Sequence, residues 1–375
     1  MYIPYGRQSI DEDDINSVIE VLKSDYLTTG PKVGEFEKIV EDYVGAKYAV
    51  AVSNGTAALH IACLAAGIGV GDEVIVSPIT FVASANCVLY CGGTPVFADI
   101  DPDTYNIDPE DVRRKITDKT KAIIAVHFTG QPCEMDELHK IAKEYNLLVI
   151  EDAAHALGAD YKGQKVGGIS DLTAFSFHPV KHITTGEGGM VTTNNEELYE
   201  KLLLYRSHGI TRDRSIMSKD DGNWYYEQLE LGFNYRITDI QCALGISQMK
   251  KLDQFIDRRR EIVCKYNCEF FGCKEIVMPK QQDGCNNSWH LYIILVNAER
   301  RKDIFNELRK RGIGVNVHYI PVYKQPYYQN HGYKDVICPN AEAVYKRMIS
   351  LPLYPLLTDK EQDYVIEQVK DLAVR

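Results

Sequence analysis

The segment Leu147-Leu-Val-Ile-Glu-Asp-Ala-Ala-His155 decides the fold class of this chain. Its first half is apolar throughout, as in a strand that is covered on both faces, and it ends in polar residues. Helical patterns separate it from other short apolar runs, which we expect to be strands at residues 48–52, 73–76, 95–98, 121–126, 173–177 and 190–193. Strands that alternate with helices in this way predict an α/β fold with a mostly parallel sheet sandwiched by helices.

The pattern differs at the two ends of the chain. Ser9 and Glu12 fit a capping box, and apolar residues then recur at helical spacing from Ile15. A long helix is expected to start near Thr238. After about residue 252 the pattern indicates strands at 291–296 and 314–318, a helix at 301–310 and two final helices, the last capped by Thr358. We therefore expect a large domain of residues 1–252 and a smaller C-terminal α+β domain of residues 253–375.

Composition narrows the class of protein. The 375 residues include 42 Lys+Arg and 53 Asp+Glu, a net charge of −11, which argues against a general nucleic-acid binder. The basic run Arg258-Arg259-Arg260 is expected to be a solvated helix face. No stretch approaches the ~18 apolar residues that span a membrane. Because the N-terminus also lacks a basic segment followed by an apolar one, we expect a cytoplasmic protein without membrane partners.

The ten cysteines are expected to be reduced thiols in such a protein. Cys264 and Cys268 share a helical face, and Cys273, Cys285 and His290 follow, so a zinc site is one alternative. No paired CxxC motif is present, and a free cysteine commonly behaves as a small buried hydrophobe. We therefore predict no metal site.

The segment Ser176-Phe-His-Pro-Val-Lys181-His-Ile-Thr-Thr-Gly-Glu-Gly-Gly189 carries the strongest chemical signal. A lysine between a strand and a glycine-rich turn provides an amine at one fixed point of a cleft, as a Schiff-base cofactor requires. A surface lysine beside a turn is the structural alternative. Asp152, at the end of the strand in the opening segment, fits the partner of a pyridinium nitrogen, or else a helix cap.

Two further motifs follow other strands of the same sheet. Ser53-Asn-Gly-Thr-Ala-Ala58 opens a helix, and its N–H groups and the Thr56 hydroxyl suit a phosphate group. Phe81, in Ser77-Pro-Ile-Thr-Phe81, can stack on a flat ring or can belong to the core. Ligands of open α/β sheets bind beyond the carboxyl ends of the strands, so the four motifs together favour one cofactor site.

In chain order (phosphate loop, aromatic residue, Asp152, Lys181) the motifs resemble those of pyridoxal phosphate enzymes with the aspartate aminotransferase fold, and more closely those of the DegT family of nucleotide-sugar aminotransferases. The similarity covers nearly the whole chain, and its markers are SNGTAAL, SPITFVASAN, EDAAHALGA, FSFHPVKHITTGEGG, RSHG and GFNYRITDIQCALG. The resemblance implies a seven-stranded, mostly parallel sheet sandwiched by helices, with a smaller C-terminal α+β domain. It also implies pyridoxal 5'-phosphate as the cofactor.

Site residues follow from the resemblance position by position. Lys181 corresponds to the lysine that forms the Schiff base, and Asp152 to the partner of the pyridine nitrogen. Phe81 resembles the ring-stacking aromatic residue, and Asn234 the residue that reaches the phosphate from the other subunit of a homodimer. The phosphate-binding set is Gly55, Thr56 and Ser176. His155 stands where many family members have Gln, in a position to contact the 3-hydroxyl of the cofactor.

The resemblance also implies contacts with a sugar nucleotide. The residues that match are Tyr5, Asp25, Tyr26, Leu27, Thr28, His318, Tyr319, Ile320 and Pro321. Arg236 is only a candidate for binding the carboxylate of the amino donor. The segments TTGEGG, RSHGI and VHYIPVY most resemble the branch that transfers the amino group of L-glutamate to C4 of a UDP-linked 4-keto-6-deoxy-N-acetylhexosamine for pseudaminic acid.

Other functions stay open at this point. Relatives aminate other nucleotide-linked keto sugars, of the GDP-perosamine or bacillosamine type, or act at C3. A dehydratase branch of the family has histidine in place of the lysine, and Lys181 argues against it. A regulator with this fold but without turnover is disfavoured because Lys181, Asp152 and Thr56 are all present.

Overall fold

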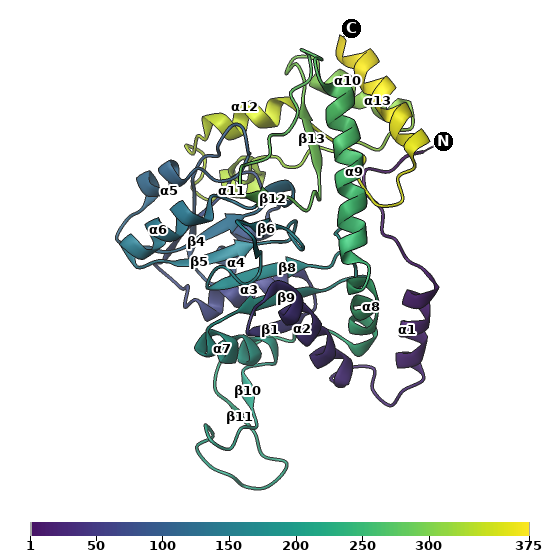
Figure 1. Cartoon of the computed structure of the whole chain (residues 1–375). Coiled ribbons are helices and arrows are strands. Elements are labelled where there is room, and N and C mark those ends of the chain that lie inside the picture. The colour runs from purple at the N-terminus through teal and green to yellow at the C-terminus, as the bar shows by residue number, and fades with distance from the viewer. Residues whose placement is uncertain (1, 375) are drawn as a thin grey trace.

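The computed structural model describes residues 2–374 and is built around a seven-stranded sheet flanked by helices (Figure 1). The strand order is β1–β9–β8–β5–β4–β2–β3. The strands are β1 Tyr48–Val52, β2 Glu73–Val76, β3 Thr94–Phe97, β4 Thr120–Val126, β5 Leu148–Asp152, β8 Leu172–Ser176 and β9 Gly189–Thr193. Strand β9 runs antiparallel to both neighbours and the other pairs are parallel. The predicted mostly parallel sheet is confirmed.

Helices cover both faces of this sheet. Alternate residues of β4 face opposite sides, with Ile124 in one apolar cluster and Ile123 in another. The face of Ile124 is covered by α3 Gly55–Ala65, α4 Ala83–Tyr90 and α7 Glu196–Arg206. The opposite face is covered by α2 Pro31–Val44, α5 Pro109–Lys115, α6 Met135–Tyr145 and α8 Asp239–Met249. Burial on both faces explains why these strands are apolar along their whole length.

A smaller α+β layer follows the long helix α9 Leu252–Phe270 (Figure 1). Strand β13 Tyr292–Leu295 pairs antiparallel with β14 Met348–Leu351. Around them lie α10 Arg301–Lys310, α12 Pro339–Arg347 and α13 Asp359–Val374, whereas Tyr328 of α11 Pro326–Gln329 packs against Phe97 of β3 in the large sheet. The N-terminal segment joins this layer, because Ile3 forms a parallel bridge with Ile313 and is buried in the same cluster.

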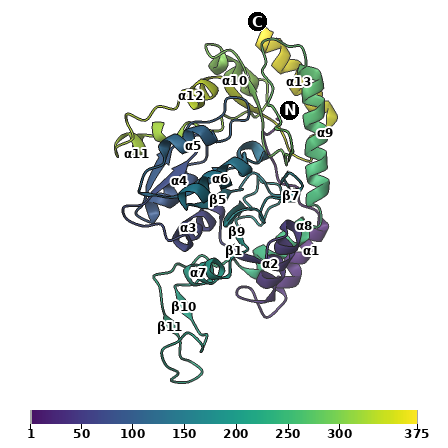
Figure 2. The ribbon, with the colours of Figure 1, turned by 60° about the vertical axis from the view of Figure 1, so that its left-hand side comes forward.

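Short elements complete the chain. They are the strands β6 Asp160–Tyr161, β7 Gln164–Lys165 and β12 Cys285–Asn286, and the 3-10 turns Phe128–Gly130 and Val322–Lys324. Strands β10 Ile210–Thr211 and β11 Glu227–Gln228 form a hairpin that projects from the body below α7 in both views (Figures 1 and 2). None of the helices within residues 2–374 is long and apolar enough to cross a membrane.

Four local expectations were wrong. Arg259, expected on a solvated helix face, is 1% exposed and donates to backbone carbonyl groups inside the structure. Helix α1 Glu12–Leu22 is capped by Asp11 instead of Ser9, because Asp11 and Asp14 each accept the backbone N–H of the other at 3.1 Å. The long helix after Thr238 is two helices, α8 and α9. Residues 314–318 form no strand, because Gly314 bonds to Ile3 whereas Asn316 pairs with Ser350, so no continuous ladder develops.

The cap of α13 allows a direct test of one sequence signal. Glu361 donates its N–H to the Thr358 hydroxyl at 3.2 Å, and the Glu361 carboxylate accepts the Thr358 N–H at 2.9 Å. We expect Thr358→Ala to lower the free energy of unfolding by about 1 kcal/mol in a urea titration, because the Glu361 N–H in the first turn of the helix loses its partner. Thr358→Ser keeps the hydroxyl and should unfold like the wild type. Equal stability of all three proteins would contradict this role of the cap.

Candidate functional site

A cavity of about 1010 Å³ opens where the parallel strands end. Its wall contains Asp152 at the end of β5, Ser176 at the end of β8 and Val126 at the end of β4. Eleven of the residues that the sequence predicts for the site line it: Tyr5, Gly55, Thr56, Phe81, Asp152, His155, Ser176, Lys181, His318, Tyr319 and Ile320. The fold thus brings the four separate motifs into one cleft.

The N-terminus of α3 forms one corner of the cavity. Asn54 caps this helix by accepting the N–H of Ala57 at 2.8 Å. A side chain on Gly55 would place its Cβ 2.8 Å from the Cβ of Ser176, so the glycine is what lets the helix end and β8 meet. The first N–H groups of a helix have no partner within it. Together with the hydroxyls of Thr56 and Ser176, they suit an anion such as a phosphate group.

Asp152 is held in place by hydrogen bonds to both carboxylate oxygens. The Ser84 hydroxyl donates to Oδ2 at 2.5 Å and the Ala154 N–H donates to Oδ1 at 3.1 Å. Thr80 supports Ser84, with 2.6 Å between the two hydroxyls. Sequence reasoning missed Ser84 and Thr80 as site residues, although both belong to the quoted motif SPITFVASAN. The carboxylate is 6% exposed and faces the cavity in a fixed orientation.

Lys181 lines the same cavity in an environment that favours its neutral amine. Burial lowers the pKa of Lys181 from 10.5 to about 8, and the opposing charge of Asp152 limits the shift. Only a neutral amine is a nucleophile or a base. The pocket therefore makes this lysine reactive at a pH where an exposed lysine is almost entirely protonated.

Imidazole rings cover the side of the cavity next to Lys181. His155 Nε2 lies 3.2 Å from the Tyr319 hydroxyl, and its ring centroid is 4.3 Å from that of His290. Burial, and then the charge of Lys181, lower the pKa of His155 well below its usual range. Burial and Lys181 likewise lower the pKa of His318 to about 4. These rings are uncharged near neutral pH.

His290 also lines the cavity, and sequence reasoning did not assign it to the cofactor site. It lies outside the quoted motifs, and the sequence analysis considered it only for zinc. Cys264 and Cys268, from the same alternative, are exposed on α9. Within residues 2–374, no group of three or more His, Cys, Asp or Glu side chains could hold a metal ion.

A second set of predicted residues does not line the cavity of this chain. It consists of Asp25, Tyr26, Leu27, Thr28, Asn234, Arg236 and Pro321. Except for the buried Pro321, they gather beside the start of α8, where Thr28 forms a bridge with Thr238 and Leu27 accepts the N–H of Asp239. Asn234 pairs with Ser207 through its backbone and is exposed.

The residues of the cavity fit pyridoxal phosphate. The α3 corner suits its phosphate, Asp152 suits a protonated ring nitrogen, and the Lys181 amine suits its aldehyde. Phe81 lines the cavity and is 57% exposed, so its ring face is open for stacking. His155 also has a buried Nδ1 without a hydrogen-bond partner among the described side chains, as expected where a ligand contributes part of the polar contacts.

Comparison with known proteins gives a consistent result along the whole chain. The chain is 44% identical to the spore coat polysaccharide biosynthesis protein SpsC of Bacillus subtilis, over 99% of this chain and 97% of that protein. It is 41% identical to a UDP-4-amino-4,6-dideoxy-N-acetyl-β-L-altrosamine transaminase of Campylobacter jejuni, over 97% and 95%. PseC of Helicobacter pylori, an aminotransferase of pseudaminic acid biosynthesis, superimposes with a TM-score of 0.92 at 35% identity and covers both chains fully.

The family to which the chain is similar uses the cofactor that fits the cavity. The sugar aminotransferases of this family use pyridoxal phosphate, and the PLP-form of Spr1654 from Streptococcus pneumoniae superimposes with a TM-score of 0.93 at 35% identity, over 100% of this chain and 99% of that one. Residues 8–370 match the description DegT/DnrJ/EryC1/StrS aminotransferase family. This chain belongs to that family and is a pyridoxal-phosphate-dependent sugar aminotransferase.

Proposed function

We propose that the protein transfers the amino group of L-glutamate to C4 of a UDP-linked 4-keto-6-deoxy-N-acetylhexosamine on the route to pseudaminic acid. The proposal rests on one observation: Lys181, Asp152 and the His318–Ile320 segment all line the same cavity. The 41% identity to the altrosamine transaminase and the fold of PseC support this choice of sugar.

The residues of the chain divide the chemistry between them. Pyridoxal phosphate, when bound, supplies the aldehyde that takes up the amino group and a ring that withdraws electrons. Lys181 removes the proton from Cα of glutamate and, in the second half of the reaction, delivers a proton to C4 of the sugar. Asp152, oriented by Ser84, keeps the ring nitrogen protonated. The α3 corner holds the phosphate, and the products are 2-oxoglutarate and the 4-amino sugar.

Another nucleotide-linked keto sugar is the second candidate. SpsC, at 44% identity, bears a name from spore coat polysaccharide biosynthesis instead of pseudaminic acid. This second candidate covers substrates of the GDP-perosamine or bacillosamine type and amination at C3.

The state of Lys181 predicts a pH dependence. A folded-state pKa of about 8 means that the neutral fraction of this amine rises through pH 8 instead of pH 10.5. After removal of the cofactor, we expect the rate at which an amine-selective acylating reagent modifies Lys181 to be half-maximal near pH 8, as followed by peptide mass spectrometry. Asp152→Asn should lower that midpoint, because the carboxylate stabilises the protonated amine. A midpoint near 10.5 would contradict the desolvation of Lys181.

The choice of substrate is tested by a panel of keto sugars. UDP-, dTDP- and GDP-linked 4-keto-6-deoxy sugars and a 3-keto sugar are assayed side by side with L-glutamate, and 2-oxoglutarate release is measured. We expect the highest kcat/KM for the UDP-linked N-acetylated 4-keto sugar. A clear preference for a 3-keto sugar or for another nucleotide would replace this proposal with the second candidate.

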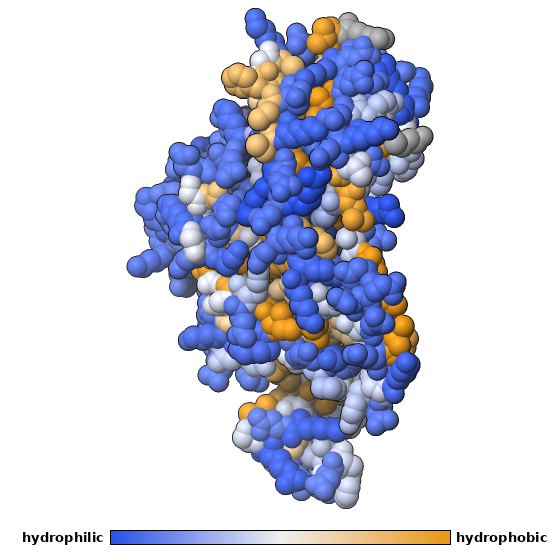
Figure 3. Space-filling model, turned by 45° about the vertical axis from the view of Figure 1, so that its right-hand side comes forward, coloured by the Kyte–Doolittle hydropathy of each residue, from blue (hydrophilic) through white to orange (hydrophobic). Residues whose placement is uncertain are grey.

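We further propose that two copies of the chain share their active sites in a homodimer. The predicted residues that do not line the cavity of their own chain support this, since Asn234 and the 25–28 segment form one exposed surface. Next to it, α1 exposes Ile15, Ile19 and Leu22 at 43%, 38% and 55%. Hydrophobic surface is visible at the height of α1 on the right of the molecule (Figure 3). A two-fold axis would bury such a face against its copy.

A complementation experiment tests the shared site. Lys181→Ala is expected to lose at least about 10²-fold in turnover, because it removes the acid–base group. A chain with Asn234→Ala is expected to lose the phosphate contact it makes to its partner. When the two inactive chains are mixed and exchange subunits, one site of each mixed dimer is wholly wild type, so activity returns. If each chain built its own site, the mixture would stay as inactive as its components.

A further inference from the structure

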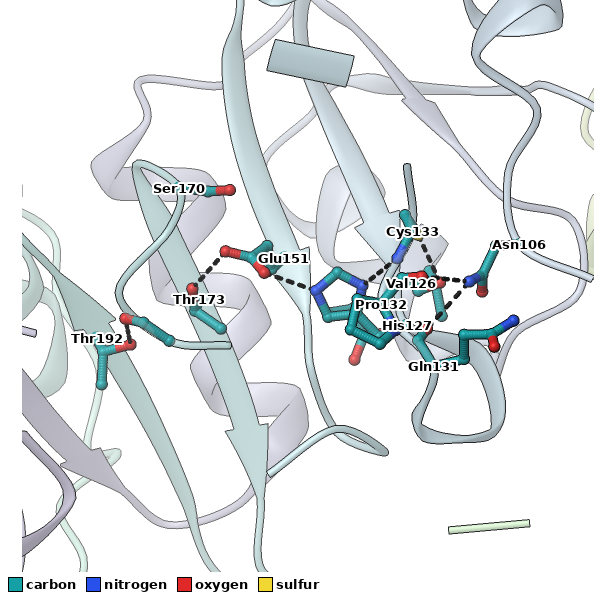
Figure 4. Close-up of polar contacts among 12 residues, drawn as sticks. Asn106, Val126, His127, Gln131, Pro132, Cys133, Glu151, Ser170, Thr173 and Thr192 are labelled. Carbon is teal, nitrogen blue, oxygen red and sulfur yellow. Dashed lines mark hydrogen bonds and ion pairs between the residues drawn. The ribbon is translucent and has the colours of Figure 1, made fainter. Parts of the chain in front are cut away.

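Glu151 and His127 form a buried pair on the side of the sheet that faces away from Asp152. Both side chains are fully buried, and His127 Nε2 lies 2.6 Å from Glu151 Oε2 (Figure 4). The Thr173 hydroxyl donates to the other carboxylate oxygen at 3.0 Å. Neighbouring residues of a strand point to opposite faces, so the Glu151 side chain turns away from the cavity that Asp152 lines.

The hydrogen bonds assign the proton of this pair. The Cys133 N–H donates to His127 Nδ1 at 3.2 Å, so that nitrogen carries no proton and Nε2–H donates to Glu151. Burial alone would raise the pKa of Glu151, but the hydrogen bond and electrostatic attraction of His127 and the hydrogen bonds of Ser170 and Thr173 outweigh it and leave that pKa below its usual value. A buried carboxylate is costly unless its oxygens are occupied by donors. Glu151 therefore fixes the orientation of the His127 ring.

His127 begins a loop, residues 127–133, that is held at several points. Asn106 donates to the carbonyl groups of Gln131 and Pro132 at 3.0 Å (Figure 4). It also accepts the N–H of Phe128 at 3.0 Å. Inside the loop, Thr129 has a φ of +62°, which a β-branched residue adopts only when its surroundings enforce it. The His127 and Asn106 contacts supply that constraint.

The same loop docks a segment from the C-terminal part of the chain. Thr129 accepts the N–H of His290 at 2.7 Å, and Gly130 accepts that of Ser288 at 3.2 Å. From the other side, Arg259 donates to the carbonyl groups of Trp289 and His290 at 3.2 and 3.3 Å. These contacts fix the backbone that carries the His290 ring, which lines the cavity 4.3 Å from the ring of His155.

We propose that Glu151 is a positioning residue of the active site, which acts through His127 and the 127–133 loop to hold His290 against His155. The arrangement of the histidines in the cavity then depends on the Glu151 carboxylate, which touches neither cofactor nor substrate. The inference rests on the placement of the cofactor proposed above, but not on which sugar is aminated.

The expected consequence is a change in the environment of His155. The titratable groups that face His155 are Lys181, His182, His290, His318 and Tyr319. If the loop loosens and the His290 ring withdraws, water reaches His155 and its protonated form becomes less costly. The pKa of His155 should then rise towards its ordinary value, whereas a purely structural role of Glu151 would lower the stability and leave the pKa of His155 in the folded protein unchanged.

The test compares Glu151→Ala with Glu151→Gln in the cofactor-loaded protein. The glutamine can accept from His127 and donate to Thr173, so it should behave like the wild type. The ring signals of His155 are followed by NMR and assigned by comparison with His155→Gln. For Glu151→Ala we expect their pH midpoint to rise by about one pH unit, which is a part of the ~3–5 units that full burial can impose. The rate of the half-reaction with glutamate, followed by visible absorbance, should fall about tenfold. An unchanged midpoint in folded Glu151→Ala would overturn the proposal.

A double-mutant cycle tests the route through His290. If Glu151 acts through that ring, the combined Glu151→Ala and His290→Ala variant loses no more rate than the worse single variant. Losses that multiply would overturn the proposal. Asp171→Asn is the control, because this carboxylate accepts the Val149 N–H at 2.8 Å at the other end of β5, and neither the His155 midpoint nor the rate should move.

Two further measurements keep the proposal open to refutation. If Glu151→Ala does not fold, Asn106→Ala loosens the same loop and should shift His155 in the same direction. A soluble His290→Ala protein with an unshifted His155 midpoint would overturn the proposal by itself. The His155 titration is repeated without cofactor, where it reports only on how His290 is held against His155. A failure of the protein to bind pyridoxal phosphate would count against the proposed function and not against this inference.

Discussion

Removal of the Lys181 amine from water is the constraint on which the rest of the cleft depends. Burial lowers its pKa to about 8, and only Asp152 acts in the opposite direction. Another cation close to Lys181 would lower this pKa further, and another carboxylate would raise it and favour the protonated amine. The surrounding imidazole rings are uncharged, which allows polar side chains to pack around the amine without changing its protonation.

The position of Asp152 places a single carboxylate on the Lys181 side of the sheet. It ends β5, so its side chain faces the cavity, while the preceding Glu151 carboxylate is directed to the other face of the sheet and is occupied by His127 and Thr173. Two adjacent carboxylates are thereby kept apart by the alternation of the strand. One of them is available to a ligand and the other is committed to the fold.

The sheet and the centre of the site could be predicted because their signals are local. A strand buried on both faces is apolar throughout, so five-residue runs such as Tyr48–Val52 were found within one residue of their true ends. The chemistry at the strand ends was contained in contiguous motifs. The expected seven-stranded sheet is therefore present, whereas the division into residues 1–252 and 253–375 and the roles of the individual site residues stay predictions.

What the sequence did not reveal depends on which of several possible contacts forms, within a helix end or between distant segments. Ser9 and Asp11 are both candidates to cap α1, and the choice of Asp11 is decided by its reciprocal hydrogen bonds with Asp14. The apolar positions of α1 correctly predicted a helix, but Ile15 and Leu22 are exposed in the single chain. Helical periodicity does not say which molecule covers the apolar face of a helix. His290 reaches the cavity only because Thr129, some 160 residues earlier in the chain, holds its backbone.

The histidine at position 155 shows how such distant contacts decide the meaning of a residue. Many family members have glutamine there, and a glutamine side chain is always neutral. A charged imidazolium at this position would repel the protonated amine of Lys181 and so disfavour that form. In this chain burial comes first, and Lys181, His318 and His182 then add to it, so the pKa of His155 lies well below its usual range. A neutral imidazole has one donor and one acceptor nitrogen, as a side-chain amide has donor and acceptor atoms. With Tyr319 at Nε2, His155 can therefore take the place of the amide without adding a charge to the cleft.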